Sequence, residues 1–328
     1  MTPNRDGKPS AWGVVAFLLL LHIVNQIDRQ LIGAFAADIM RDLDLSRSQF
    51  ALIAGFAFSG VYSVAALAAG ILADRHGQRR VLTVGLAIWS LFTALAGLAR
   101  GFWTMLITRP LVAAGEATLV PTATNLILAR VAEAHKAAAL GLFFAGIPLG
   151  IGAGFLIAGQ LGPLLGWRGT FMMMGAIGLV ALATLTRFPG DPARGQAASG
   201  LTANLSELWL IYRRSPRVRW STLAMIAAHA HVATNPFVQL WLTSEKGLDR
   251  QSAASLYGLA FVSVGLIGTI GSGLLGDWAK RRLGWDRAWT VLVLLLVLAP
   301  MLPVYRLASG GTGLFLAGMV ASILFMTV

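Results

Sequence analysis

Long apolar segments alternate with short polar loops along the whole chain. The apolar runs approach 20 residues, which is the length that carries a helix across the roughly 30 Å hydrocarbon core of a bilayer. The pattern predicts ten spans, over residues 12–35, 50–73, 81–99, 102–128, 137–161, 170–186, 220–242, 254–276, 288–305 and 312–328. The predicted fold class is therefore an all-α polytopic membrane protein.

Composition supports this class. Only 12% of the 328 residues are charged and 56% are hydrophobic, whereas a soluble domain has about 25% charged residues. A large soluble core would need charges distributed through the apolar runs. The net charge of +12 does not indicate a nucleic-acid partner, because the basic residues lie in short loops. The chain has no cysteine, which excludes disulfides and thiolate metal sites.

Lysine and arginine are distributed unevenly between alternate loops. With the N-terminus inside, the inner segments hold 17 of the 26 basic residues and the outer loops hold 7, while Arg29 and Arg109 fall within spans. Cytoplasmic loops of membrane proteins carry an excess of basic residues. We therefore expect a cytoplasmic N-terminus and a first apolar segment that is retained as a span.

A charged, glycine-containing turn occurs twice. Residues 70–80 read GILADRHGQRR and residues 273–282 read GLLGDWAKRR, with a constant offset of 203 residues. Such a recurrence indicates two copies of one folding unit. A carboxylate at a helix end beside arginines can form a charge-assisted contact that exists in only one conformation. The candidate conformational residues are Gly70, Asp74, Arg75, Gly77, Arg79, Arg80, Gly273, Asp277 and Arg282.

The repeat predicts two pseudo-symmetric helical bundles. We expect an N-terminal six-helix bundle over 1–187, a cytoplasmic linker over 188–219 and a partial C-terminal bundle of about four helices over 220–328. In the linker, Leu205, Leu208, Trp209 and Tyr212 recur at helical spacing, which predicts a short amphipathic helix on the inner membrane surface. A plain solvated linker is the alternative. The chain stops within an apolar run, so the second bundle is expected to lack two spans.

The first span carries ionisable side chains in an apolar helix. His22, Asn25 and Arg29 recur at spacings of three and four and form one polar stripe, with Asp28 about 100° round the helix from Arg29. Charges at this depth are costly unless they face protein or a water-filled cavity. The alternative is that the span ends early and leaves Asp28 and Arg29 in an outer loop.

The fourth span carries a second pair of charges. Arg109 and Glu116 lie seven residues apart, which places them on one face about 10 Å apart along the axis. Counting inward from each span end predicts that Arg109 lies level with Asp28, with Glu116 deeper. A carboxylate whose arginine contact changes between two cavity states can take up a proton in one and release it in the other. A structural ion pair is the alternative role for Glu116.

The turn at 70–80 resembles the signature of the major facilitator superfamily, G-x-L-x-D-R-x-G-R-R/K-x, with Gln78 as its departure. N-x-x-D-R in the first span and R-x-x-x-x-x-G-E-A in the fourth are similar to the bacterial spinster-type branch, although Ala113 replaces a usual glycine. The resemblance implies twelve spans in two bundles and a central cavity that opens to alternate sides. It further implies a monomeric proton-coupled carrier of the bacterial inner membrane, with Asp28 and Glu116 as proton acceptors, Arg29 and Arg109 tuning them, and a lysophospholipid-like amphiphile as substrate.

The remaining polar residues add candidates without fixing a substrate. The 203-residue offset places His231 opposite Asp28, so His231 and Asn235 are candidates to face the cavity. Gly146, Gly150 and Gly154 recur every fourth residue, which favours close helix packing.

The sequence shows no metal-ligand spacing, phosphate-binding lysine loop or nucleophile motif. We therefore predict a transporter with no cofactor and no enzymatic activity, whose partners are protons, a small organic solute and the bilayer. A lipid-handling enzyme, a non-transporting remnant or receptor, and a drug or organic-anion carrier of another branch are the alternatives.

Overall fold

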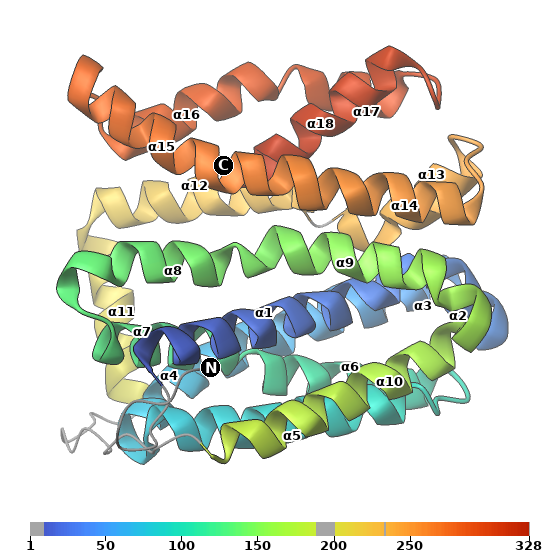
Figure 1. The fold of residues 1–328 in the computed structure, drawn as a ribbon, viewed down its shortest axis with the longest axis horizontal. Helices are drawn as coiled ribbons and strands as arrows, with labels where there is room; N and C mark the ends of the chain where they lie inside the picture. The colour runs from blue at the N-terminus through green and yellow to red at the C-terminus, as the bar shows by residue number, and fades with distance from the viewer. Residues whose placement is uncertain (1–9, 188–200, 233, 328) are drawn as a thin grey trace. The chain divides into compact units, whose positions relative to one another are not determined.

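The computed structural model describes residues 10–187, 201–232 and 234–327 (Figure 1). Within these residues all regular structure is helical, which confirms the predicted all-α class. The first part of the chain forms α1 (Ala11–Ala34), α2 (Ala36–Asp42), α3 (Arg47–Ala51), η1 (Leu52–Ala57), α4 (Phe58–His76), α5 (Gln78–Ala96), α6 (Phe102–Glu116), α7 (Leu119–Arg130), η2 (Glu133–His135), α8 (Lys136–Phe144), α9 (Gly146–Gln160) and α10 (Gly162–Leu185). The second part forms α11 (Leu201–Arg214), α12 (Pro216–Val232), η3 (Asn235–Phe237), α13 (Val238–Ser244), α14 (Arg250–Ala260), η4 (Phe261–Gly265), α15 (Leu266–Leu283), α16 (Arg287–Leu298), α17 (Met301–Leu307) and α18 (Gly313–Thr327).

Eight helical segments of the described chain are long and apolar enough to cross a membrane. They are Ala11–Ala34, Arg47–His76, Gln78–Ala96, Phe102–Arg130, Glu133–Gln160, Gly162–Leu185, Arg250–Leu283 and Ala288–Leu307. They correspond to eight of the ten spans predicted from hydropathy. The last predicted span corresponds to α18, a shorter apolar helix of 15 residues.

The remaining predicted span, over 220–242, is not one continuous helix. Helix α12 ends at Val232, a 3-10 turn covers Asn235–Phe237, and α13 begins at Val238. Pro236 has no backbone N–H to donate and its ring clashes with the preceding turn. The hydropathy of this segment is continuous, but its hydrogen-bond ladder is interrupted.

Two spans contain π-helical segments, η1 and η4. They precede α4 and α15, the two helices that carry the repeated charged motif. A π-helical turn inside an α-helix is rare and is frequent at functional sites. The repetition of this feature supports the two copies inferred from the sequence.

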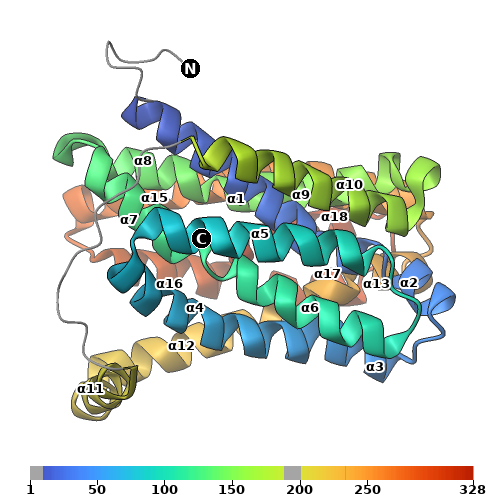
Figure 2. The same cartoon turned by 90° about the horizontal axis from the view of Figure 1, so that it is seen from below.

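The described chain forms two compact units. The first contains Ile39–Lys136, the described residues of Phe171–Pro236 and those up to Val14; the second contains Val15–Asp38, Ala137–Thr170 and the described residues of Phe237–Val328. In the first unit α6 packs against both α4 and α5 and lies between them in Figure 2. In the second unit α9 lies between α1 and α14 (Figure 1).

Glycines allow the close packing of α9. A Cβ atom at Gly150 would lie 2.6 Å from the Ile23 carbonyl oxygen of α1, and one at Gly152 would lie 2.5 Å from the Gly258 carbonyl oxygen of α14. Real Cβ atoms do not approach backbone so closely, so both faces of α9 need glycine. The packing role predicted for the glycine series is confirmed, and a second glycine face toward α14 is added to it.

The linker helix forms as predicted. Helix α11 covers Leu201–Arg214, and the Trp209 and Tyr212 rings stack with centroids 5.7 Å apart. Trp209 and Ile211 are exposed, which suits a helix that lies on a membrane surface. Residues 188–200 of the predicted linker lie outside the described residues, and the boundaries of the two predicted bundles stay a prediction.

Candidate functional site

The charged residues of the first span lie inside α1. Asp28 is 1% exposed, Asn25 is buried and Arg29 is half-buried. Helix α1 continues to Ala34, beyond all three. The alternative of an early span end that leaves Asp28 and Arg29 in an outer loop is therefore wrong.

His22 contacts the backbone and rings of α8. Its Nδ1 lies 2.9 Å from the Phe143 carbonyl oxygen, its ring stacks on Phe143 with centroids 4.4 Å apart, and Gln26 Nε2 lies 3.5 Å from its Nε2. Because a carbonyl oxygen only accepts, Nδ1 carries the proton and Nε2 can accept from the Gln26 amide. Both contacts suit the neutral imidazole, so the contacts seen for His22 position helices.

Asn25 is the polar group of the α1 stripe with a spare donor. Among the described residues its buried Nδ2 has no hydrogen-bond partner. A buried amide donor of this kind costs free energy unless a bound molecule or water satisfies it. Asn25 is therefore the α1 residue best suited to hydrogen-bond a solute.

The charged residues of the fourth span lie on α6 and are buried in the first unit. Arg109 is 1% exposed and Glu116 is fully buried. The Arg109 guanidinium carbon lies 4.9 Å from the centroid of the Phe58 ring of α4. This cation–π contact places a positive charge against an apolar ring, and sequence periodicity gives no sign of it.

Close packing of α5 on α6 fixes the turn that carries Glu116. A Cβ atom at Gly115 would lie 2.5 Å from the Gly85 carbonyl oxygen and 2.6 Å from the Trp89 nitrogen. The residue before Glu116 must therefore be glycine for the two helices to meet. A backbone contact of this kind holds Glu116 on a rigid element.

Asp28 belongs to the second unit, whereas Arg109 and Glu116 belong to the first. The expected pairing of Asp28 with Arg109, and the depth of Glu116 relative to the α1 stripe, stay predictions.

The first copy of the charged motif forms the predicted turn. Gly77 ends α4 with φ 89° and ψ 142°, a conformation that favours glycine. Arg79 Nη2 donates to the Thr186 carbonyl oxygen at 2.5 Å, and Gln78 Nε2 lies 3.4 Å from Asp74 Oδ1. The arginine contact predicted for Asp74 stays a prediction.

The second copy ends differently. Helix α15 continues past Asp277 and Arg282 to Leu283, and Gly284 caps it in the left-handed conformation with φ 67°. The Gly284 N–H donates to the Ala279 carbonyl oxygen. The repeated motif therefore lies at a helix end in both copies, but α15 continues further past its aspartate, to Leu283, than α4 does, to His76.

The predicted cavity residues of the seventh span are partly described. Asn235 is buried in the 3-10 turn after α12. His231 lies on α12, and its side chain is outside the described residues. In the described part of the chain no group of three or more metal-ligating side chains occurs.

The ion pair between Asp38 and Arg250 was not predicted from the sequence. Asp38 Oδ2 forms an ion pair with Arg250 Nη1, and the Arg250 guanidinium carbon lies 5.0 Å from the centroid of the Phe35 ring. Nearby, Gln160 Nε2 lies 3.2 Å from Ser255 Oγ. These contacts join α2, the residue before it and α9 to α14 at one end of the second unit. The charges of the ion pair lie too far apart in the sequence for their spacing to reveal them.

The helices have the length and composition of a multi-pass membrane protein, and ionisable side chains are buried within them. Residues 18–328 match the sequence profile described as the Major Facilitator Superfamily, and the chain belongs to that family. The family match confirms the predicted membership of this superfamily, and the similarity to spinster proteins confirms the predicted likeness to the spinster-type branch.

Relatives from several branches are similar to the chain. An MFS-type efflux pump of Mycolicibacterium smegmatis is 31% identical over 303 residues, which cover 90% of this chain and 70% of the pump. A hexuronate transporter of Bacillus subtilis is 27% identical over 85% of this chain and 66% of its own length. Human protein spinster homolog 1 is 30% identical over 60% of this chain and 36% of its own length.

A solved structure shows the same fold. The crystal structure of a bacterial homolog to the human lysosomal transporter Spinster, in an inward-facing and unoccupied conformation, aligns with a TM-score of 0.80 and 26% identity. The alignment covers 98% of this chain and 74% of that protein. The chain thus spans between about a third and three quarters of the proteins it resembles.

Proposed function

We propose that the protein is a proton-coupled secondary active transporter of an organic solute that works by alternating access. The burial of Asp28, Arg109 and Glu116 at 1%, 1% and 0% exposure carries this proposal. All three lie in helices that are apolar enough to span a membrane. Ionisable residues at such positions mark substrate and proton pathways by default.

Proton coupling follows from charges that can change partners. A buried carboxylate beside a cation stays ionised, whereas one that loses its cation takes up a proton. Asp28 and Glu116 are the proposed proton acceptors, and Arg29 and Arg109 are the cations that control them. Movement between the two cavity states would then bind a proton on one side and release it on the other.

The proposed solute is an anionic or zwitterionic amphiphile, such as a lysophospholipid. The Arg109 guanidinium next to the Phe58 ring offers a charge and an apolar surface in one place. The buried amide of Asn25 adds a donor for a polar headgroup. The motifs of the first and fourth spans that resemble the spinster-type branch are the reason for proposing this class of substrate.

The contact between Asp38 and Arg250 at one end of the second unit supports alternating access. The ion pair of Asp38 with Arg250 joins α2 to α14, and residue 250 belongs to an outer loop in the orientation with a cytoplasmic N-terminus. Contacts that break and reform at such an end are the usual means of opening a cavity. We assign this pair to the closed outer end.

The proposed setting is a bacterial inner membrane with the N-terminus in the cytoplasm and a monomeric carrier. The basic residues concentrate in the segments that would face the cytoplasm. The two bundles over 1–187 and 220–328, joined by 188–219, are the bodies that would move against each other.

Transport in proteoliposomes tests the proposal. Uptake of radiolabelled lysophosphatidylglycerol is measured with and without an imposed pH gradient. We expect Asp28→Asn and Glu116→Gln to abolish the gradient-driven part of uptake while the protein still inserts. Asp44→Asn and Glu133→Gln are matched controls, because they make the same changes at exposed positions. Full gradient-driven uptake by both test variants would overturn the proton assignment.

A carrier of hydrophilic organic anions or drugs is the second candidate. It is favoured by the similarity to the efflux pump and the hexuronate transporter over most of this chain. Competition decides between the two. Glucuronate that competes fully with lysophosphatidylglycerol would favour the organic-anion carrier, and the absence of any uptake would favour a non-transporting role.

A further inference from the structure

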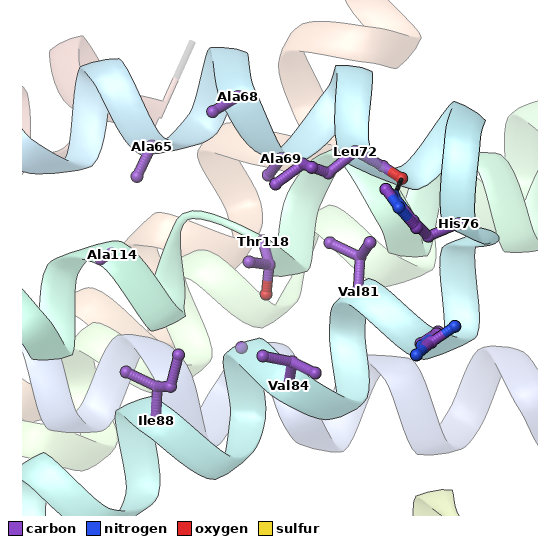
Figure 3. Close-up of a pocket in the computed structure, with 12 residues that line it drawn as sticks. Ala65, Ala68, Ala69, Leu72, His76, Val81, Val84, Ile88, Ala114 and Thr118 are labelled. Carbon is purple, nitrogen blue, oxygen red and sulfur yellow. Dashed lines mark hydrogen bonds between the residues drawn. The ribbon is translucent and has the colours of Figure 1, made fainter.

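The first unit contains a cavity that none of the proposed proton-coupling or solute-binding residues lines. It measures about 320 Å³ and lies between α4, α5 and the junction of α6 with α7 (Figure 3). Helix α4 contributes alanines, including Ala65 and Ala68, and α5 contributes Val84 and Ile88. Small residues on one wall and branched ones on the other leave an unfilled apolar space.

The polar groups of the wall are satisfied locally. Thr118 donates its hydroxyl hydrogen bond to the Gly115 carbonyl oxygen at 2.8 Å. His76 Nδ1 lies 3.1 Å from the Leu72 carbonyl oxygen, which leaves Nε2 available for a ligand. An apolar cavity of this kind does not hold water well.

The two basic side chains of the lining lie at one end. His76 is in the last turn of α4 and Arg80 is in the first turn of α5, on either side of the Gly77 turn. Figure 3 shows Ala65 and Ile88 far from His76 along the cavity. The cavity is therefore apolar along most of its length and has a basic end at His76 and Arg80, which we call its mouth.

We propose that this cavity binds one acyl chain of an anionic phospholipid of the bilayer, with the lipid phosphate on Arg80 and His76. The eleven steps along the helix from Ala65 to His76 rise about 16 Å, which is about half of the roughly 30 Å hydrocarbon core and so matches one leaflet. The volume lies at the lower end of ligand pockets, which fits one chain rather than a whole drug-sized molecule.

The charge of the mouth selects the headgroup. Basic residues next to a membrane attract anionic lipids, most strongly on the cytoplasmic side. The mouth lies beside the motif turn, which the distribution of basic residues assigns to that side. Lipid binding at this cavity requires that the chain inserts into a membrane, but it requires neither proton coupling nor a particular transported solute.

Lipid retention tests the site. The full chain is placed in nanodiscs of equal parts phosphatidylglycerol and phosphatidylcholine with identical acyl chains, released, and analysed by native mass spectrometry. We expect preferential retention of one phosphatidylglycerol. Arg80→Gln should lower this preference about fivefold, as one interfacial basic residue does. Arg130→Gln, a change at another basic helix end of the same unit, should leave it unchanged.

Filling the cavity separates an acyl-chain site from a surface charge effect. Ala68→Leu should reduce retention at least tenfold, because the added side chain displaces several methylene groups of the lipid. Val64→Leu is the matched control, since Val64 is 72% exposed on α4 and does not line the cavity. If Ala68→Leu does not fold, Ala65→Leu replaces it. Equal retention of the two lipids by the parent, or unchanged retention by both filled variants, would overturn the proposal.

Discussion

The ion pair between Asp38 and Arg250 yields a quantitative prediction about cavity opening. The Asp38 side chain is 15% exposed and that of Arg250 is 40% exposed. An exposed pair contributes about 0–1 kcal/mol, whereas breaking a fully buried one costs about 3–5 kcal/mol. For this half-buried pair we expect Asp38→Asn to weaken the closed end by about 1–2 kcal/mol, which shifts the closed-to-open ratio about five- to thirtyfold.

Cysteine labelling measures that shift. The chain has no native cysteine, so Ser255→Cys introduces a single thiol at the α9–α14 contact. Its reaction rate with a membrane-impermeant maleimide should rise by the same factor when Asp38→Asn is added. Asp44→Asn, which removes the charge of an exposed carboxylate six residues further along the chain, should leave the rate unchanged.

The exchanged pair is the decisive control. Asp38→Arg combined with Arg250→Asp keeps one charge of each sign, so labelling should return toward the parent rate. If Asp38→Asn leaves the rate unchanged, or if the exchanged pair reacts as fast as the single variant, the ion pair does not hold the end closed.

Two further outcomes follow from the second unit. Gly152→Val should prevent normal folding, because the Cβ of the new side chain would lie 2.5 Å from the Gly258 carbonyl oxygen. Gly55→Val is the control: a Cβ at Gly55 would meet no atom within 4 Å, so this variant should insert and unfold at nearly the parent temperature. A hydrogen bond from the Ser252 side chain, together with the Ser252 N–H that donates to Asp249 Oδ1 at 3.0 Å, holds the pKa of the Asp249 carboxylate below its usual value. Because the pKa is lowered on folding, the cap stabilises α14 above the unfolded pKa of about 3.9 and is lost as pH falls through the folded value. Asp249→Ala should therefore speed amide exchange in the first turn of α14 at pH 7, and a difference that persists undiminished at pH 2 would contradict the charge-based cap.

Hydropathy predicted most of the spans because a bilayer sets both their length and their composition. It missed the interruption at Pro236, since the residues around it remain apolar while the backbone hydrogen bonds do not continue. It also missed the break in α10 at Gly166, where φ is 64°. The predicted sixth span began at 170, just beyond that break.

The candidate site was predictable in its residue types but not in its partners. Charges within apolar runs identified Asp28, Arg109 and Glu116, and all three are buried. The Phe58 ring against Arg109 depends on how α4 packs on α6, which one sequence does not encode locally. The stacking of His22 on Phe143 likewise depends on the pairing of α1 with α8.

The crossing of α9 and α14 has a mechanical consequence. At Gly152 and Gly258 the two backbones meet directly, with the Val262 and Leu156 side chains beside the contact, so we expect the helices to tilt about this point. Arg250 lies eight residues from Gly258, an arm of about 12 Å. A tilt of about 10° would therefore displace the end of α14 by about 2 Å, which is enough to separate a charge pair while the crossing itself stays in contact.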